Sequence, residues 1–188
     1  MPIEETTETI KVAGGDDIDL TIRSTAHGPI ISGLTDDFTA IADDPEPGLT
    51  AGGATGTAPT GEASEYAVSL RWTALDPGTA ATAIFALSTA QDFEEFRSAA
   101  ALFDVPAQNL IYADVEGNIG YQTPGRLPVR GAGDGWMPQP GWDSSYDWTG
   151  FIPFDELPVS YNPASGYIVT ANNAIVTDDY PYLSLIHI

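Results

Sequence analysis

Hydrophobic and polar positions alternate near the start of the chain in a pattern that predicts a β-hairpin. Residues 9–12 and 18–22 place apolar side chains at every second position, and they flank Gly14-Gly15-Asp16-Asp17. A period of two is typical of a strand with one buried face, and glycines suit a tight reversal. After a turn at residues 27–29, we expect the chain to re-enter a strand at Ile30-Ile31.

A helical period follows in the middle of the chain and predicts one clear helix. Thr89 is its expected cap, and Asp92 and Glu94 lie in its first turns, where the helix dipole favours negative charge. Residues 104–106 end it, because Pro106 cannot continue a helix. Its apolar stripe is spaced as a buried helix face requires and consists of Phe93, Phe96, Ala100 and Phe103.

The remaining apolar runs predict strands separated by loops. We expect strands at residues 66–72 and 167–170, and a second hairpin that pairs residues 110–113 with 118–121 around Glu116-Gly117. The Gly/Ala/Thr/Pro-rich residues 43–64 predict a flexible surface loop, and the Pro/Gly/Trp-rich residues 124–163 predict a long ordered loop over the core. The fold class is therefore α+β, with mostly antiparallel strands and few helices.

The charge balance is strongly acidic and limits the partners. The 188 residues include 27 acidic and 6 basic side chains, for a net charge of −21. Nucleic acid and anionic membrane surfaces need clustered Lys and Arg, so neither is an expected partner. A solvated acidic surface is the main interpretation, and a calcium-organised surface is the alternative. No apolar run is long enough to span a membrane, and no signal peptide is recognisable; an exported parent protein would carry its signal outside this sequence.

Most familiar catalytic patterns are missing. The sequence has no G-x-S-x-G elbow, zinc helix, P-loop or dinucleotide fingerprint, and it contains no cysteine. His27 is interpreted as a turn residue bonded to backbone; a general base would also need a neighbouring serine and an orienting carboxylate. His187 lies in a C-terminal stretch, residues 183–188, that is expected to be non-native. The acidic pairs lack EF-hand spacing and predict exposed turns: Asp16-Asp17, Asp36-Asp37, Asp43-Asp44 and Asp178-Asp179.

Two asparagines after the last expected strand allow two interpretations. An asparagine at a strand end can direct its side-chain NH2 toward a developing oxyanion, as Asn172 and Asn173 would in an amide-hydrolysing site. A pair of asparagines after a strand is more often a turn. Composition and spacing leave both interpretations open.

An ordered series of sequence blocks resembles the penicillin acylase family, which includes acyl-homoserine-lactone acylases and glutaryl-type acylases. The likeness extends from about Thr9 to Pro181, weakest at residues 43–64, and its specificity lies in the order and spacing of the blocks. In chain order they are RSTAHGP (23–29), LRW (70–72), NLIYADVEGNIGY (109–121), GRLPVR (125–130), PGW (140–142), WTGFIPF (148–154), LP (157–158), NPASGYI (162–168) and TANN (170–173).

The resemblance implies a self-processing amidase of the amino-terminal-nucleophile class, with a four-layer αββα sandwich. In that family a new β-subunit amino-terminal serine attacks the amide carbonyl, and its own α-amino group is the base. The oxyanion-hole asparagine falls on Asn172, with Asn173 as the runner-up. The serine and a backbone oxyanion donor are expected upstream of Met1, and an organising arginine beyond the C-terminal end, so residues 1–182 are expected to be an incomplete piece of the β-subunit domain that is inactive alone.

The same resemblance implies partners, a cofactor and a location. The expected partners are a small N-acyl substrate, the α-subunit and the remaining β-subunit segments of the same precursor. No cofactor is expected for catalysis. A structural calcium ion is expected in the complete enzyme, with one carboxylate position near Ser184 and a carbonyl position near Gly135, and most of its ligands upstream. The parent protein is expected to be periplasmic or secreted.

A second hypothesis comes from a different class of protein. Residues 136–148 form a Trp- and Tyr-rich stretch that would stack on sugars or other flat ligands in an acidic, secreted, β-rich binding module without catalytic activity. Structural packing is the commoner use of such tryptophans. The two hypotheses differ upstream, because only the amidase needs a Ser, Thr or Cys at a self-cleavage junction.

Overall fold

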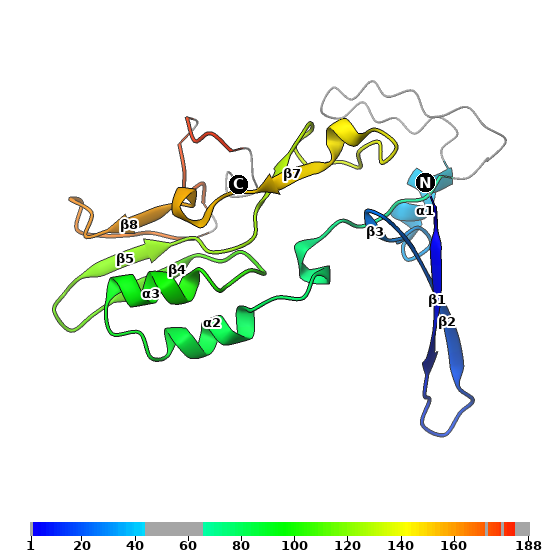
Figure 1. Cartoon of the computed structure of the whole chain (residues 1–188), viewed down its shortest axis with the longest axis horizontal. Coiled ribbons are helices and arrows are strands. Elements are labelled where there is room, and N and C mark those ends of the chain that lie inside the picture. Colours follow the sequence, from blue (N-terminus) through cyan, green and yellow to red (C-terminus); the bar gives the residue numbers. More distant parts are fainter. Residues whose placement is uncertain (1, 44–65, 172, 178, 183–188) are drawn as a thin grey trace. The chain divides into compact units, whose positions relative to one another are not determined.

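The computed structural model describes residues 2–43, 66–171, 173–177 and 179–182, which form two compact units (Figure 1). Unit 1 comprises residues 1–75 and 132–147, and unit 2 comprises residues 76–131 and 148–188. In chain order the elements are β1 (Glu4–Ile10), β2 (Ile18–Thr25), β3 (Gly28–Pro29), α1 (Asp36–Asp43), α2 (Ala80–Leu87), α3 (Phe93–Ala100), β4 (Leu110–Ala113), β5 (Ile119–Gln122), β6 (Pro128–Arg130), β7 (Trp148–Phe151) and β8 (Val159–Tyr161).

The predicted N-terminal hairpin is present in unit 1, with longer strands than the sequence pattern indicated. β1 and β2 pair antiparallel from Glu4 opposite Ser24 to Ile10 opposite Ile18, and β3 adds a short third strand beside β2. Gly28 has φ +113°, and a Cβ atom there would lie 2.2 Å from the Leu70 carbonyl oxygen. Only glycine fits this close approach of two backbones.

The predicted strand at residues 66–72 is reduced to a single bridge between Ile30 and Ser69. The Ile31 N–H donates to the Val68 carbonyl at 2.8 Å, and the Leu70 N–H donates to the Pro29 carbonyl at 2.9 Å. This contact is too short for a ladder, so the strand prediction is wrong in extent.

Helix α1 was not expected from the sequence. Asp36 and Asp37 occupy its first turn, where carboxylates interact favourably with the helix dipole, and the Thr35 hydroxyl accepts from the Phe38 N–H at 3.3 Å. The prediction of an exposed turn at this acidic pair is therefore wrong. Capping and dipole chemistry explain the acidic pair here.

In unit 2 the sequence predicted helix α3 but not helix α2. Helix α3 contains Phe93, Phe96 and Ala100 of the expected stripe but ends at Ala100, so Phe103 lies beyond it; its cap is Asp92, whose Oδ1 accepts from the Glu95 N–H at 2.8 Å. Thr89 instead bonds back to the Ala86 carbonyl at 3.0 Å, so its assignment as the cap is wrong. Helix α2 was missed because its sequence, AATAIFAL, is nearly all apolar and shows no helical period.

The second predicted hairpin is confirmed and lies in a three-stranded antiparallel sheet of order β4-β5-β8. Helix α3 packs on one face of this sheet (Figure 1). The Phe93 ring stacks on Tyr161 with centroids 4.5 Å apart, and it lies over Gly120, where a Cβ atom would come 2.4 Å from Phe93 Cε2. Gln122, at the end of β5, is fully buried and its Oε1 accepts from Arg97 Nε at 2.9 Å.

Residues 124–163 are not one long loop, as the sequence suggested. They contain β6, β7 and β8, and β6 pairs antiparallel with β7 in a two-stranded sheet. Pro and Gly interrupt these strands so often that their alternation is too short to recognise. Conversely, the predicted strand at residues 167–170 has no ladder among the described residues, with Tyr167 and Val169 exposed.

All strand pairs in the described ranges are antiparallel and the helices are few and short, so the α+β prediction is confirmed. The predicted flexible loop at 43–64, except Asp43, and the C-terminal stretch 183–188 lie outside the described residues.

Candidate functional site

The predicted oxyanion residue, Asn172, lies outside the described residues, so its role stays a prediction. Its neighbours form a local turn. The Ala171 N–H donates to Asn173 Oδ1 at 2.9 Å, and Asn173 Nδ2 donates to the Ala174 carbonyl at 3.0 Å. The exposed Asn173 side chain thus satisfies adjacent backbone groups, as short polar side chains do in turns.

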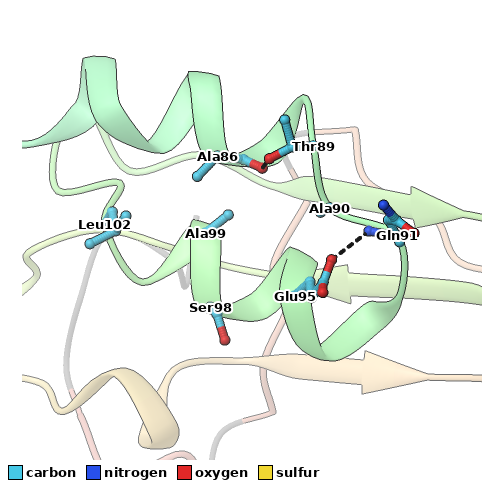
Figure 2. A pocket seen from close by; sticks show the side chains of 8 residues that line it. All are labelled: Ala86, Thr89, Ala90, Gln91, Glu95, Ser98, Ala99 and Leu102. Carbon is cyan, nitrogen blue, oxygen red and sulfur yellow. Dashed lines mark hydrogen bonds between the residues drawn. The ribbon is translucent and has the colours of Figure 1, made fainter.

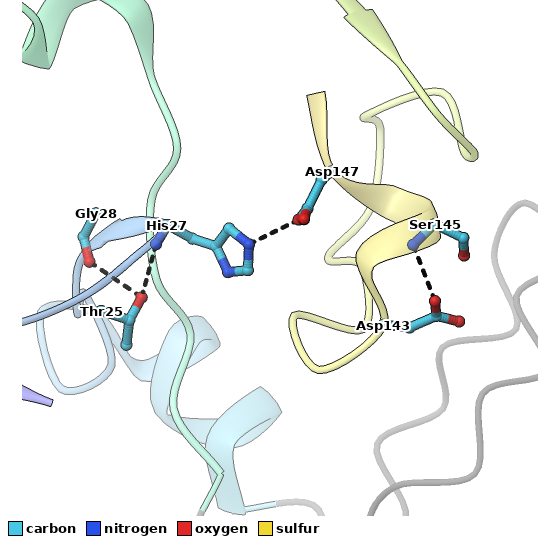
Figure 3. Close-up of polar contacts among 6 residues, drawn as sticks. All are labelled: Thr25, His27, Gly28, Asp143, Ser145 and Asp147. Carbon is cyan, nitrogen blue, oxygen red and sulfur yellow. Dashed lines mark hydrogen bonds and ion pairs between the residues drawn. The ribbon is translucent and has the colours of Figure 1, made fainter. Parts of the chain in front are cut away.

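His27 makes a long-range contact that the sequence did not indicate. Its Nε2 lies 2.8 Å from Asp147 Oδ1, and the two side chains are 27% and 47% exposed (Figure 3). Both residues belong to unit 1, although they are 120 positions apart. The interpretation of His27 as a turn residue holds for its backbone only, because its N–H donates to Thr25 Oγ1 at 3.1 Å. Its ring instead joins residues 132–147 to the β2–β3 turn.

The His27–Asp147 pair lacks a nucleophile among its described contacts. The Thr25 hydroxyl donates to the Gly28 carbonyl at 3.4 Å and accepts from the His27 backbone, so it serves the turn (Figure 3). Ser145 lies on the same short helical turn that ends at Asp147, and its N–H donates to Asp143 Oδ1 at 2.9 Å. This bond lowers the pKa of the Asp143 carboxyl. The arrangement holds a loop in place and does not form a catalytic triad.

The described carboxylates do not gather around a metal position. Within the described ranges no three His, Cys, Asp or Glu side chains are placed to hold a metal ion. Asp17 pairs with Lys11, and Asp134 Oδ1 accepts from the Trp136 N–H at 2.9 Å beside Gly135. These residues do not form a calcium site by themselves, because calcium requires six to eight oxygens. Asp44, Asp178 and Ser184 lie outside the described residues.

Two pockets in the described part of unit 2 do not include Asn173 in their lining. The larger, about 460 Å³, is an open depression between α2 and α3 (Figure 2); its lining residues are Ala86, Thr89, Ala90, Gln91, Glu95, Ser98, Ala99 and Leu102. There the Gln91 N–H donates to Glu95 Oε2 at 2.9 Å, which closes the turn before α3. The smaller, about 270 Å³, is lined by Asp104, Arg126 and aromatic side chains. In the larger pocket the Thr89 hydroxyl donates to the Ala86 carbonyl, and in the smaller the Thr79 hydroxyl donates to the Leu102 carbonyl, so neither hydroxyl is paired with a carboxylate base.

Two titratable groups with shifted pKa values, Tyr112 and Asp114, lie at the β4–β5 turn. Asp114 accepts from Asn118 Nδ2 at 2.7 Å and from two backbone N–H groups, and the Asn118 bond is the main cause that lowers the pKa of its carboxyl. Desolvation, followed by the hydrogen bond to Asp114, raises the pKa of Tyr112 to about 12. Asn162 ties the turn to β8 by donating to Asn118 Oδ1 at 2.8 Å. The hydrogen bonds of Asp114 and Asn118 stabilise the turn between β4 and β5.

The family of this chain follows from a match that spans nearly all of its residues. The family model described as "Penicillin amidase" matches residues 1–187. The chain therefore belongs to the penicillin amidase family, as the resemblance of its sequence blocks predicted.

Curated relatives carry the names of two kinds of acylase, both amidohydrolases. Penicillin acylase 2 proenzyme of a Pseudomonas species is 34% identical over 180 residues, which cover 96% of this chain and 20% of the relative. Acyl-homoserine lactone acylase QuiP of Pseudomonas fluorescens is 30% identical over 180 residues, 96% of this chain and 19% of the relative. Penicillin G acylase of Escherichia coli is 34% identical over 178 residues, 93% and 17% respectively. The chain thus spans about a fifth of the length of these relatives.

A solved structure supports the same fold assignment. Thermostable penicillin G acylase from Alcaligenes faecalis matches with a TM-score of 0.67 and 30% sequence identity, over 96% of this chain and 28% of that one. The α+β arrangement with few helices therefore occurs within an acylase of this family. Among the described residues, no helix combines the length and apolar character needed to cross a bilayer.

Proposed function

We propose that these residues are an internal part of the β-subunit of a self-processing amidase. The enzyme would hydrolyse the amide bond of N-acyl compounds, either penicillin-type β-lactam side chains or N-acyl-homoserine lactones, through an amino-terminal serine supplied by sequence upstream. The observation that carries the proposal is the family match over residues 1–187. The acylase names of the relatives support it.

In the proposed reaction, the serine oxygen attacks the amide carbonyl while the serine α-amino group accepts its proton. The carbonyl oxygen becomes an oxyanion, and Asn172 would donate a side-chain N–H to it. The tetrahedral intermediate collapses with release of the protonated amine, and water then releases the carboxylic acid from the acyl-enzyme. The Asn172 N–H would stabilise the negative charge that develops on the carbonyl oxygen in the transition state, and this lowers the activation barrier.

The bonds of Asn173 favour Asn172 for this role. Asn173 Oδ1 and Nδ2 both engage backbone atoms of residues 171–174, so its amide orientation is set by the turn. The Oδ1 atom and one of the two Nδ2 hydrogens are therefore already used by the backbone, which leaves the Asn173 side chain less free to turn toward a substrate carbonyl. The proposal therefore assigns the oxyanion to Asn172 and a turn-forming role to Asn173.

The proposal needs no histidine, which agrees with the contacts of His27. Its Nε2 is bonded to Asp147, and the structure gives the pair a role in holding residues 132–147. The remaining expectations belong to the complete protein. They are a structural calcium ion with most ligands outside this chain, an α-subunit and further β-subunit segments as partners, and a periplasmic or secreted location.

The packing of the aromatic stretch weakens the hypothesis of a binding module. Trp142 lies against Tyr66 with ring centroids 6.0 Å apart, and Trp148 meets Phe151 edge to face at 6.1 Å. Trp136 is exposed. Trp142 and Trp148 therefore contact aromatic neighbours, which is a structural use of these rings, although Trp142 is still 40% exposed and Trp136 64%.

The test begins with the full reading frame. The protein would be expressed, the masses and amino-terminal sequences of its mature chains determined, and phenylacetyl, aliphatic and homoserine-lactone amides offered as substrates. We expect two chains, the larger beginning with a new Ser, Thr or Cys upstream of residue 1, and amide hydrolysis. A single uncleaved chain with no such residue would contradict the proposal, as would turnover by the 188 residues alone.

A matched pair of variants tests the oxyanion assignment. Asn172→Ala should lower kcat by about 100- to 1,000-fold with folding and processing intact, whereas Asn173→Ala should change kcat much less. Equal losses of kcat in both variants would show that activity depends on the turn and not on an oxyanion donor at Asn172.

A further inference from the structure

The β1–β2 hairpin of unit 1 carries apolar side chains on one face that the other described residues of unit 1 leave exposed. Residues that are directly opposite in an antiparallel pair project from the same face of a sheet. The register places Ile10 opposite Ile18, Glu8 opposite Leu20, and Thr6 opposite Ile22. Four apolar side chains therefore share this face, and their exposed fractions are 48% for Ile10, 56% for Ile18, 48% for Leu20 and 37% for Ile22.

The opposite face of the hairpin is polar. Thr7 lies opposite Thr21, and Thr9 lies opposite Asp19. The Thr9 hydroxyl donates to Asp19 Oδ1 at 2.7 Å, so this cross-strand pair is satisfied without a partner segment. The first face is therefore mixed, because β2 contributes Ile18, Leu20 and Ile22 whereas most of the β1 side chains on it are polar.

A two-stranded ribbon of this kind is incomplete by itself. An isolated hairpin is marginally stable in water and needs packing on its apolar face. Contiguous exposed apolar side chains rimmed by polar ones mark an interaction surface. The strict alternation in β2 keeps Ile18, Leu20 and Ile22 on one side over the whole strand, which a purely solvated ribbon would not require.

We propose that this face is covered, in the full-length protein, by a segment of the same polypeptide that lies outside residues 1–188. The curated relatives are about five times as long as the matched region, so most of such a protein is available to supply the segment. The covering segment would present apolar side chains over β2. It would present Lys, Arg or hydroxyl groups over the β1 side, where Glu4 and Glu8 share the same face. This inference rests on the proposed function only in taking the chain as part of a longer acylase.

Charge disfavours a second copy of the chain as the occupant. A partner copy would bring its own Glu4 and Glu8 to the interface, and both copies carry a net charge of −21. Like charges brought together at a desolvated interface oppose association. A segment of different composition avoids this repulsion.

Cysteine labelling in the full-length protein tests whether the face is covered. This chain has no native cysteine, so Leu20→Cys and Thr21→Cys place single thiols on the two faces at adjacent positions. Labelling would be quantified on the peptide that carries each residue. We expect Leu20→Cys to react about tenfold or more slowly than Thr21→Cys, since a packed segment must open before the thiol is reached. Equal rapid labelling, or protection of both positions, would overturn the inference.

Photo-cross-linking then identifies the occupant. Benzoylphenylalanine at Leu20 should form adducts that map outside residues 1–188 of the same molecule, whereas the same probe at Thr21 should not. Adducts within residues 1–188 would overturn the proposal, and so would adducts between ¹⁴N- and ¹⁵N-labelled molecules in a mixed sample. Processing and amidase activity would be measured on the same preparations. Protection at Leu20→Cys without processing would refute the proposed function and leave this inference standing.

Discussion

Replacing Gly120 with alanine should destabilise the protein, although glycine-to-alanine changes in strands and helices usually do the opposite. Gly120 is buried in β5 beneath helix α3, and an added Cβ atom would lie 2.4 Å from Phe93 Cε2 and 2.7 Å from Phe93 Cδ2. The Phe93 ring cannot simply move aside. Its ring centroid lies 4.5 Å from that of Tyr161, on which it stacks, and 5.4 Å from that of Tyr112.

Two opposing effects set the magnitude. Alanine restricts the unfolded chain and stabilises by about 0.4–1 kcal/mol where the backbone tolerates it. Overpacking a filled site costs about 1–3 kcal/mol. The cost of the clash should be larger, so the free energy of unfolding should fall by about 1–2 kcal/mol. For a domain of this size each kcal/mol lowers Tm by about 2–4 °C.

Thermal unfolding of Gly120→Ala, followed by circular dichroism, measures this loss. Gly150→Ala is the matched control, because it also lies in a strand but a Cβ atom there meets nothing within 4 Å. A third variant combines Gly120→Ala with Phe93→Ala. Relative to Phe93→Ala alone, the added alanine should cost nothing, because the clashing ring is gone. An unchanged or raised Tm for Gly120→Ala would refute the steric reasoning.

Other predictions concern the cap, the buried glutamine and the β4–β5 turn. Asp92→Ala should lower the free energy of unfolding by about 1 kcal/mol, and Thr89→Ala by less, because Asp92 caps α3; equal losses in urea unfolding would contradict this. Arg97→Met should cost about 1–3 kcal/mol by leaving the fully buried Gln122 Oε1 without its donor, while Asp155→Ala, at the exposed end of the same arginine, should be near neutral in the same assay. The pKa of Tyr112 is raised in the folded protein, so the stabilisation linked to its proton is complete below about pH 10 and lost as pH rises through about 12; Tyr112→Phe should flatten that decline. The lowered pKa of Asp114 has the opposite sign, so its stabilisation is present above the ordinary carboxyl range and lost on acidification, and Asp114→Asn should reduce acid sensitivity.

The sequence predicted those elements whose signals are local and periodic. Both hairpins were found because period-two alternation and glycine turns lie within a dozen residues of one another. Helix α2 was missed because its eight residues are nearly uniformly apolar, and β6–β8 were missed because proline and glycine shorten each strand to three or four residues. The assigned cap at Thr89 failed since Asp92 offers a carboxylate at the position where the helix actually begins.

The assignment of Asn172 as the oxyanion residue rests on the order and spacing of the sequence blocks and not on local chemistry. Nothing local distinguishes Asn172 from a turn residue, and the groups proposed to act with it are expected outside residues 1–188. The His27–Asp147 contact was equally out of reach, since 120 residues separate the two side chains and neither has a distinctive sequence context.

The interleaving of the two units has a consequence for synthesis on the ribosome. Unit 1 needs residues 132–147, and unit 2 needs residues on both sides of that stretch, so the chain passes between units at 75–76, 131–132 and 147–148. The β1–β2 hairpin can form as soon as it emerges, but Asp147 reaches His27 only after most of unit 2 has been made. At about 5–20 residues per second, the nascent hairpin waits several seconds for its closing contact. The isoleucine-rich side of the hairpin would stay available to chaperones for longer still, until the covering segment proposed above has been made and has packed on it.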